Sequence, residues 1–173
     1  MSHPLLDVLD NAALAWGLAA CGVAQLSKLV IELVVHRRWR PSVLVETGGM
    51  PSSHSALMTG TSAAIGWLHG FADPVFALAA VVTFVILYDA SGVRRAAGLT
   101  AARVNGLPDG LWDTHPPGGI DQEPVLHPLK ENLGHTRLEV LAGSLIGPAV
   151  ALPGLVFVGS PSHLARVLFH GLG

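Results

Sequence analysis

Four long apolar stretches constrain the fold of this chain more than any other feature. They cover residues 11–35, 55–71, 74–90 and 138–159. Each has roughly 17–25 residues, close to the ~20 that an α-helix needs to cross the hydrocarbon core of a bilayer. The buried helices of a soluble bundle would need polar faces at helical spacing, which these stretches mostly lack. We therefore predict an all-α fold, a polytopic transmembrane helix bundle with about four spanning helices.

Charge is scarce outside these stretches as well. Only 13% of the 173 residues are charged, and the formal net charge is −2, whereas about 25% of a soluble domain is charged. This composition excludes a disordered chain and a nucleic-acid-binding protein that relies on a basic surface. Residues 1–10 contain no Lys or Arg, so they lack the basic start of a secretory signal, and we expect the first apolar stretch to remain as an anchor.

The chain is expected to form a single membrane-embedded domain over residues 1–173. Residues 106–128 are rich in Pro and Gly, which predicts an irregular loop. The loop histidines, His115 and His127, have no clustered ligand spacing, so no metal site is expected there. Residues 161–173 are too short to span and are expected to lie at the interface. Several glycines are expected to let neighbouring helices approach closely, namely Gly17, Gly22, Gly60, Gly66, Gly143 and Gly147.

The few positive charges predict the orientation in the membrane. Eight of the ten Lys and Arg fall in the first and third connections between the apolar stretches: Arg37, Arg38, Arg40, Arg94, Arg95, Arg103, Lys130 and Arg137. Loops rich in Lys and Arg stay in the cytoplasm. We therefore expect these two connections to face the cytoplasm and both tails to face the opposite side.

The first polar cluster is Thr47-Gly-Gly-Met-Pro-Ser-Ser-His-Ser55. Its glycines and proline can deliver Ser52 or Ser53 as a helix N-cap. Backbone N–H groups at such a helix start bind anions, and His54 in the first turn could give or take a proton. An ordinary loop and cap with an incidental histidine explains the same residues equally well.

The second polar cluster is Gly134-His-Thr-Arg-Leu-Glu139. Because His135 and Glu139 are four residues apart, they share a helical face, and the carboxylate can hold one imidazole nitrogen and leave the other nucleophilic. Lys130 lies just before them. A common surface pair is the alternative, but a His/Glu pair at a membrane boundary favours function.

Two further groups of polar residues lie in or beside the apolar stretches. Arg94 and Arg95 follow the third stretch, and Arg suits bidentate recognition of phosphate oxygens. The alternative is that one of these arginines only anchors the end of the apolar stretch on the cytoplasmic side of the membrane. Lys28 forms a polar stripe with Gln25 and Glu32 inside the first stretch. Such intramembrane charges are functional by default, and we expect this stripe to face the bundle interior.

These clusters resemble one protein superfamily. Pro51-Ser-Ser-His54 resembles the Pro-Ser-Gly-His motif of the type 2 phosphatidic acid phosphatase and vanadium haloperoxidase superfamily, and His135-x-x-x-Glu139 resembles its His-x-x-x-Asp motif. The longer strings Gly-Gly-Met-Pro-Ser-Ser-His-Ser-Ala, Tyr-Asp-Ala-Ser-Gly-Val-Arg-Arg-Ala-Ala and Leu-Gly-His-Thr-x-x-Glu-Val are similar to its small divergent bacterial and plastid branch. Together they cover about residues 24–147.

The resemblance implies catalytic roles for three residues. His54 would protonate the leaving group, His135 would attack phosphorus to form a phosphohistidine, and Glu139 would orient His135. The phosphate oxygens would be bound by a wider set, with the candidates Lys28, Ser52, Ser53, Arg94, Arg95 and Lys130. No metal and no other cofactor is implied.

The cationic part of the pattern departs from the superfamily. Its first motif places Lys six residues before Arg-Pro, whereas eleven residues separate Lys28 from Arg40-Pro41 here. Its third motif has an Arg shortly upstream of the His, where this chain has Leu129-Lys130. Whether Arg40, Arg94 or Arg95 supplies the phosphate-binding guanidinium therefore stays open.

The predicted function is that of a membrane enzyme that hydrolyses a lipid phosphomonoester, such as phosphatidylglycerophosphate, at the cytoplasmic face of a bacterial inner membrane. The alternatives are an undecaprenyl pyrophosphate or phosphatidic acid phosphatase, and a non-catalytic lipid-phosphate-binding membrane protein. The expected partners are the lipid phosphate and membrane lipids, without nucleic acid. A homodimer is compatible with the little surface that four helices bury.

Overall fold

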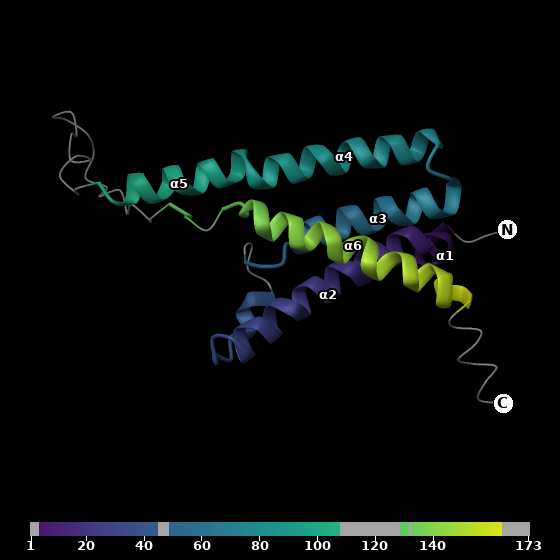
Figure 1. Cartoon of the computed structure of the whole chain (residues 1–173), viewed down its shortest axis with the longest axis horizontal. Coiled ribbons are helices and arrows are strands. Elements are labelled where there is room, and N and C mark those ends of the chain that lie inside the picture. Colours follow the sequence, from purple (N-terminus) through teal and green to yellow (C-terminus); the bar gives the residue numbers. More distant parts are fainter. Residues whose placement is uncertain (1–3, 45–48, 108–128, 132, 164–173) are drawn as a thin grey trace.

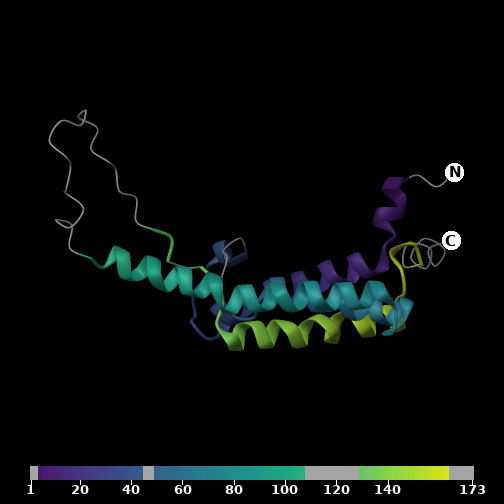
Figure 2. The same ribbon diagram turned by 90° about the horizontal axis from the view of Figure 1, so that it is seen from above.

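A computed structural model describes residues 4–44, 49–107, 129–131 and 133–163 of the chain. In these segments the regular elements are α1 (Pro4–Leu9), α2 (Ala12–Val34), the 3-10 helix η1 (Pro41–Leu44), α3 (Ser53–His69), α4 (Pro74–Ser91), α5 (Val93–Asn105) and α6 (Arg137–Phe157). The four apolar stretches correspond to α2, α3, α4 and α6, which pack into one bundle (Figures 1 and 2). The prediction of an all-α membrane helix bundle is confirmed.

The four bundle helices are not equivalent, although the sequence predicted about four spans. α2, α6 and the unit formed by α4 and α5 (Pro74–Asn105) are long and apolar enough to cross a membrane. α3 has 17 residues, several of them Gly, Ser or Thr. It contacts α2, α4 and α6, so its side chains meet other helices over much of its surface and need less apolar character than a lipid-facing helix.

Small residues make up the core of the bundle. Ala20, Ala24 and Ala56 are fully buried, and they pack together between α2 and α3. Large apolar side chains such as Phe84 and Phe157 point outward. This is the arrangement expected in lipid, where close van der Waals packing of small residues holds helices together and the large side chains face acyl chains.

The glycines of α6 bring α3 close to it. A Cβ atom on Gly143 would overlap the carbonyl oxygen of Ser52, and one on Gly147 would lie 2.5 Å from the backbone nitrogen of Gly60. The predicted close approach is therefore confirmed at this helix pair. It is wrong at Gly22, because no atom lies within 4 Å of a Cβ built there.

The sequence did not predict α5. This helix extends α4 beyond the ends of α3 and α6 (Figure 1), and its Ala and Arg residues favour a helix that is too polar to be detected as a span. The Asn105 side chain donates to the carbonyl oxygen of Leu129 at 2.8 Å and accepts from its backbone N–H at 2.9 Å. The chain that returns toward α6 is thereby attached to the end of α5.

Two predicted segments fall largely outside the described residues. The irregular loop was predicted over residues 106–128, with its two histidines, and only residues 106–107 of it are described. Of the interfacial segment predicted over residues 161–173, only residues 161–163 are described.

Candidate active site

The polar clusters meet at one end of the bundle because neighbouring helices alternate in direction. The N-terminal ends of α3 and α6 lie at the same end as the C-terminal ends of α2 and α4 (Figure 1). The C-terminal end of α6 lies at the opposite end, beside α1. The expectation that the clusters share one side of the protein is therefore consistent with the fold.

Ser52 begins α3 and also joins it to α6. Its side chain is the N-cap of α3, accepting from the backbone N–H of Ser55 at 3.3 Å, and it pairs with the Ser55 hydroxyl at 2.9 Å. Its own backbone N–H donates to the carbonyl oxygen of Glu139 at 3.0 Å. The predicted N-cap is thus Ser52 and not Ser53, and Ser52 links the starts of the two helices.

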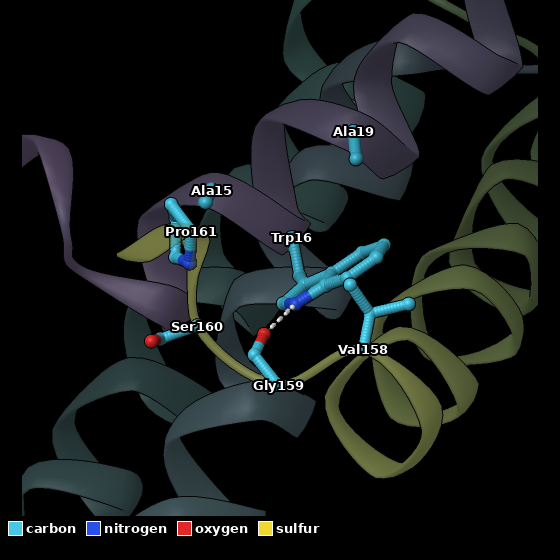
Figure 3. A pocket seen from close by; sticks show the side chains of 7 residues that line it. All are labelled: Ala15, Trp16, Ala19, Val158, Gly159, Ser160 and Pro161. Carbon is cyan, nitrogen blue, oxygen red and sulfur yellow. Dashed lines mark hydrogen bonds between the residues drawn. The ribbon is translucent and has the colours of Figure 1, made fainter. Parts of the chain in front are cut away.

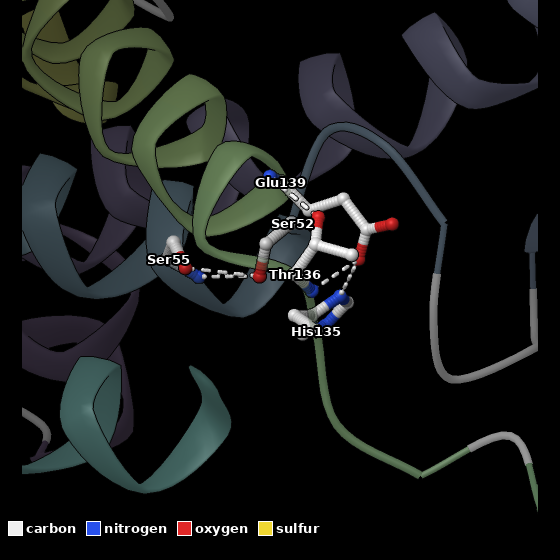
Figure 4. A network of polar contacts seen from close by, with 5 residues as sticks. All are labelled: Ser52, Ser55, His135, Thr136 and Glu139. Atoms are coloured by element: carbon white, nitrogen blue, oxygen red, sulfur yellow. Dashed lines mark hydrogen bonds and ion pairs between the residues drawn. The ribbon is translucent and has the colours of Figure 1, made fainter. Parts of the chain in front are cut away.

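A capping box begins α6 (Figure 4). The backbone N–H of Glu139 donates to the Thr136 hydroxyl at 3.2 Å, and the Glu139 carboxylate accepts from the backbone N–H of Thr136 at 3.0 Å. Such reciprocal bonds satisfy two donors at the helix start. They also hold the carboxylate at a fixed position beside the residue that precedes the cap.

That residue is His135, and its ring is held by the same carboxylate. Nδ1 of His135 lies 3.0 Å from Oε2 of Glu139, and the imidazole is almost fully buried. A carboxylate accepts hydrogen bonds, so Nδ1 carries the proton in the neutral ring and Nε2 keeps its lone pair. The pairing predicted from the sequence is confirmed. His135 lies before α6, however, so the pair results from the capping box and not from a shared helical face.

The backbone around His135 is fixed by the end of α4. The His135 N–H donates to the carbonyl oxygen of Ala90 at 2.9 Å. Gly134 has a φ of 77° and packs so closely that a Cβ atom would lie 2.6 Å from Cα of Arg95. Only glycine combines this left-handed backbone with so close an approach. The histidine is therefore positioned by α4 and α6 together with the start of α5.

Lys28 brings a buried positive charge to the same place. It is 3% exposed, and its ammonium group interacts electrostatically with the Glu139 carboxylate. A buried cation of this kind within a membrane-embedded bundle marks a functional site by default. Its neighbours in the polar stripe point elsewhere, since Gln25 donates to the carbonyl oxygen of Leu44 and Glu32 pairs with His36.

His54 lies opposite His135. The centroids of the two rings are 6.4 Å apart, with 52° between their planes. His54 is in the first turn of α3 and exposed on its outer side. Partial enclosure by the bundle lowers the pKa of His54, and its electrostatic interactions with His135, Lys28 and Arg94 lower it further.

The remaining predicted cations are less closely tied to the histidines. Arg94 lies within electrostatic range of His54, and its Nε donates to Oδ2 of Asp89 at 2.6 Å. Arg95 and Lys130 are exposed, and within the described segments neither side chain forms a hydrogen bond or an ion pair with a histidine. Ser53 is buried at the start of α3. Their roles in phosphate binding stay predictions.

Some residues that build the site were not singled out from the sequence. Thr136 caps α6, and Ala90 fixes the backbone of His135. A signal for Thr136 was present, because Thr136-x-x-Glu139 has the capping-box spacing. No local pattern pointed to Ala90, since its contribution is a backbone carbonyl far away in the sequence.

Comparison with known proteins identifies the family of this chain. The sequence profile described as the Divergent PAP2 family matches residues 9–150, which contain both histidines and Glu139. The chain belongs to this family. The resemblance found from the sequence motifs is thus confirmed at the level of the Divergent PAP2 family, a branch related to phosphatases.

A relative from Bacillus subtilis (strain 168) extends the match. It is named "Uncharacterized membrane protein YuiD" and is 36% identical over 155 residues, which cover 85% of this chain and 96% of the relative. Its name agrees with the integral membrane location that the apolar helices indicate. No solved structure matches the chain.

Proposed function

We propose that this protein is a membrane phosphatase that hydrolyses a lipid phosphomonoester through a phosphohistidine intermediate. The observation that carries the proposal is the pairing of His135 with Glu139, 3.0 Å apart, opposite His54. A site that only bound phosphate would not need a buried histidine whose second nitrogen is left nucleophilic. Membership of the Divergent PAP2 family supports the same class of reaction.

In the first step, the Nε2 lone pair of His135 forms a bond with phosphorus while the bond from phosphorus to the ester oxygen breaks. His54 gives its proton to the departing oxygen, so the lipid leaves as an alcohol. The phosphorylated imidazole is positively charged, and the Glu139 carboxylate stabilises it through the Nδ1 proton. Lys28 and Arg94 are the cations proposed to offset the charge of the phosphoryl oxygens.

In the second step, His54 is neutral and takes a proton from water. The water oxygen bonds to phosphorus as the bond from phosphorus to Nε2 breaks. Inorganic phosphate is released, and both histidines return to their starting forms. No step uses a metal ion.

The proposed substrate is a phosphomonoester presented by the cytoplasmic leaflet, such as phosphatidylglycerophosphate. The support is the charge bias, because eight of the ten Lys and Arg lie in the two connections at the site end. Reporter fusions test this side. A reporter in the α3–α4 turn, residues 70–73, should be extracytoplasmic, and one at Gly92 should be cytoplasmic; the reverse result would remove the argument for this substrate.

The activity itself is tested by phosphate release from purified protein. Phosphatidylglycerophosphate, phosphatidic acid and undecaprenyl pyrophosphate are compared, with His135→Ala as the control. We expect release from the first substrate and none from the variant. Equal release by the variant would contradict the phosphohistidine mechanism, and binding without release from any lipid would favour a non-catalytic lipid-phosphate-binding protein.

A further inference from the structure

A second polar pocket lies at the C-terminal tip of α2. It has a volume of about 370 Å³ and is lined by Glu32, His36, Arg38 and Arg40. In Figure 1 this tip diverges from the start of α6, where His135 lies. None of the four lining residues is among those that surround His135, although both groups lie at the same end of the bundle.

The backbone of this pocket has a defined shape. Arg37 has a left-handed backbone with φ of 51°, which turns the chain so that the N–H of Arg38 donates to the carbonyl oxygen of Glu32 at 3.1 Å. Farther along, η1 is attached to α2 because the Gln25 amide donates to the carbonyl oxygen of Leu44 at 2.8 Å. The connection from α2 to η1 is thus held at both of its ends.

The charges around the pocket suit an anion. Arg38 and Arg40 line it, and Arg37 adjoins them. Its acidic lining residue, Glu32, lies 3.4 Å from Nδ1 of His36. With a neutral imidazole the lining residues carry two positive charges, on Arg38 and Arg40, and one negative charge, on Glu32. Guanidinium groups match phosphate oxygens in a two-pronged geometry.

The position of the pocket indicates where the anion comes from. α2 is a candidate membrane span that ends at Val34, so Glu32 lies in its last turn and the arginines follow it. Trp39 lies among the arginines and is 68% exposed, and tryptophan is enriched at the level of the lipid headgroups. Basic pockets next to the cytoplasmic ends of spans bind anionic lipid headgroups.

We propose that this pocket binds the phosphate group of an anionic phospholipid that is not the substrate. A water molecule in liquid takes up about 30 Å³, so the pocket of about 370 Å³ has the volume of roughly twelve water molecules. This suffices for a phosphodiester with a small polar headgroup. A phospholipid headgroup and a soluble compound could both supply this anion, and in both it is a phosphate ester. A soluble phosphate ester has the same anion but no acyl chains, so the experiment separates the two sources.

The test is native mass spectrometry of the full chain in detergent, titrated with phosphatidylglycerol or phosphatidylcholine. We expect phosphatidylglycerol to bind more tightly than phosphatidylcholine. Arg38→Gln should weaken phosphatidylglycerol binding about tenfold, because one charge-assisted contact is lost. Arg103→Gln, which removes an exposed arginine of α5, is the matched control and should leave binding unchanged.

A variant with the opposite effect guards against loss of fold. Glu32→Gln removes the acidic group of the lining and should strengthen phosphatidylglycerol binding about threefold, which a misfolded protein would not do. Equal weakening by Arg38→Gln and Arg103→Gln would overturn the proposal. It would also be overturned if His135→Ala alone abolished binding, or if soluble glycerophosphoglycerol or inorganic phosphate bound as tightly as the lipid.

Discussion

The two ends of the bundle use the same helices for opposite purposes. At one end, the start of α6 holds His135 and Glu139 beside Lys28 of α2. At the other end, α2 and residues 158–161, which follow α6, line a small pocket of about 170 Å³ (Figure 3), in which the Trp16 indole donates to the carbonyl oxygen of Gly159 at 2.9 Å. One end groups polar side chains around His135, whereas the other is closed by the large indole ring of Trp16.

The two ends differ in how the ring nitrogen atoms of Trp16 and His135 are hydrogen-bonded. The Trp16 nitrogen has a partner within the fold, and the rest of its ring covers Gly154, where a Cβ atom could not fit. His135 uses one nitrogen for its partner, and its other nitrogen is available for chemistry. Changes at the site end should therefore affect turnover, and changes at the Trp16 end should affect stability.

Replacement of the nucleophile should have the largest effect. We expect His135→Ala to lower kcat by at least about a thousandfold, because the variant lacks the imidazole proposed to attack phosphorus. The thermal unfolding midpoint should change little in comparison. Phosphate release and a thermal melt in detergent measure both quantities, and a large loss of stability with retained turnover would assign His135 to the structure alone.

Replacement of the proposed acid should have the next largest effect. His54→Ala should lower kcat/KM by about a hundredfold or more, as for other general acids.

The pH profile tests the same role of His54. A general acid must be protonated, and the pKa of His54 is lowered. As the pH rises, kcat/KM should therefore already decrease at a pH below 6.5, the ordinary pKa of histidine. In His54→Ala this alkaline limb should disappear. An unchanged limb in the variant would assign it to another group.

Glu139→Gln separates orientation from charge. Gln at this position still fits a capping box, so α6 should form normally. The amide cannot stabilise a positively charged imidazole as a carboxylate does, and we expect roughly a tenfold fall in kcat/KM. An equal loss in Glu139→Ala, measured by the same phosphate-release assay, would show that the charge is what matters.

The contact between α3 and α6 should be weakened by a single added methyl group. Gly147→Ala should destabilise the protein by about 1–3 kcal/mol, because the new Cβ would press on Gly60. Gly22→Ala is the matched control, since nothing lies within 4 Å of a Cβ there, and it should be neutral or slightly stabilising. Thermal melts in detergent compare the two variants.

The smallest effect is expected at the Trp16 end. Trp16→Phe keeps most of the ring but removes its donor to Gly159. We expect a loss of about 1 kcal/mol in the free energy of unfolding and unchanged phosphate release. A clear fall in turnover without destabilisation would contradict the division of roles between the ends.

The sequence by itself determined the four bundle helices and the identity of the polar groups at their ends. Apolar runs are local, so the extents of α2, α3, α4 and α6 follow from them. The spacing of His135 and Glu139 is local as well, and so is the pattern that predicted an N-cap at Ser52 or Ser53, of which the structure has Ser52. These features depend on residues a few positions apart, which is why they can be predicted without a tertiary structure.

The tertiary structure decided how those groups are used. It placed His135 before a capping box, tied its backbone to Ala90 and put the Lys28 charge beside Glu139. It also made α3 an inner helix of the bundle. Each of these facts depends on how closely helices distant in sequence can pack, and glycines such as Gly143 set that distance only once their partners are known.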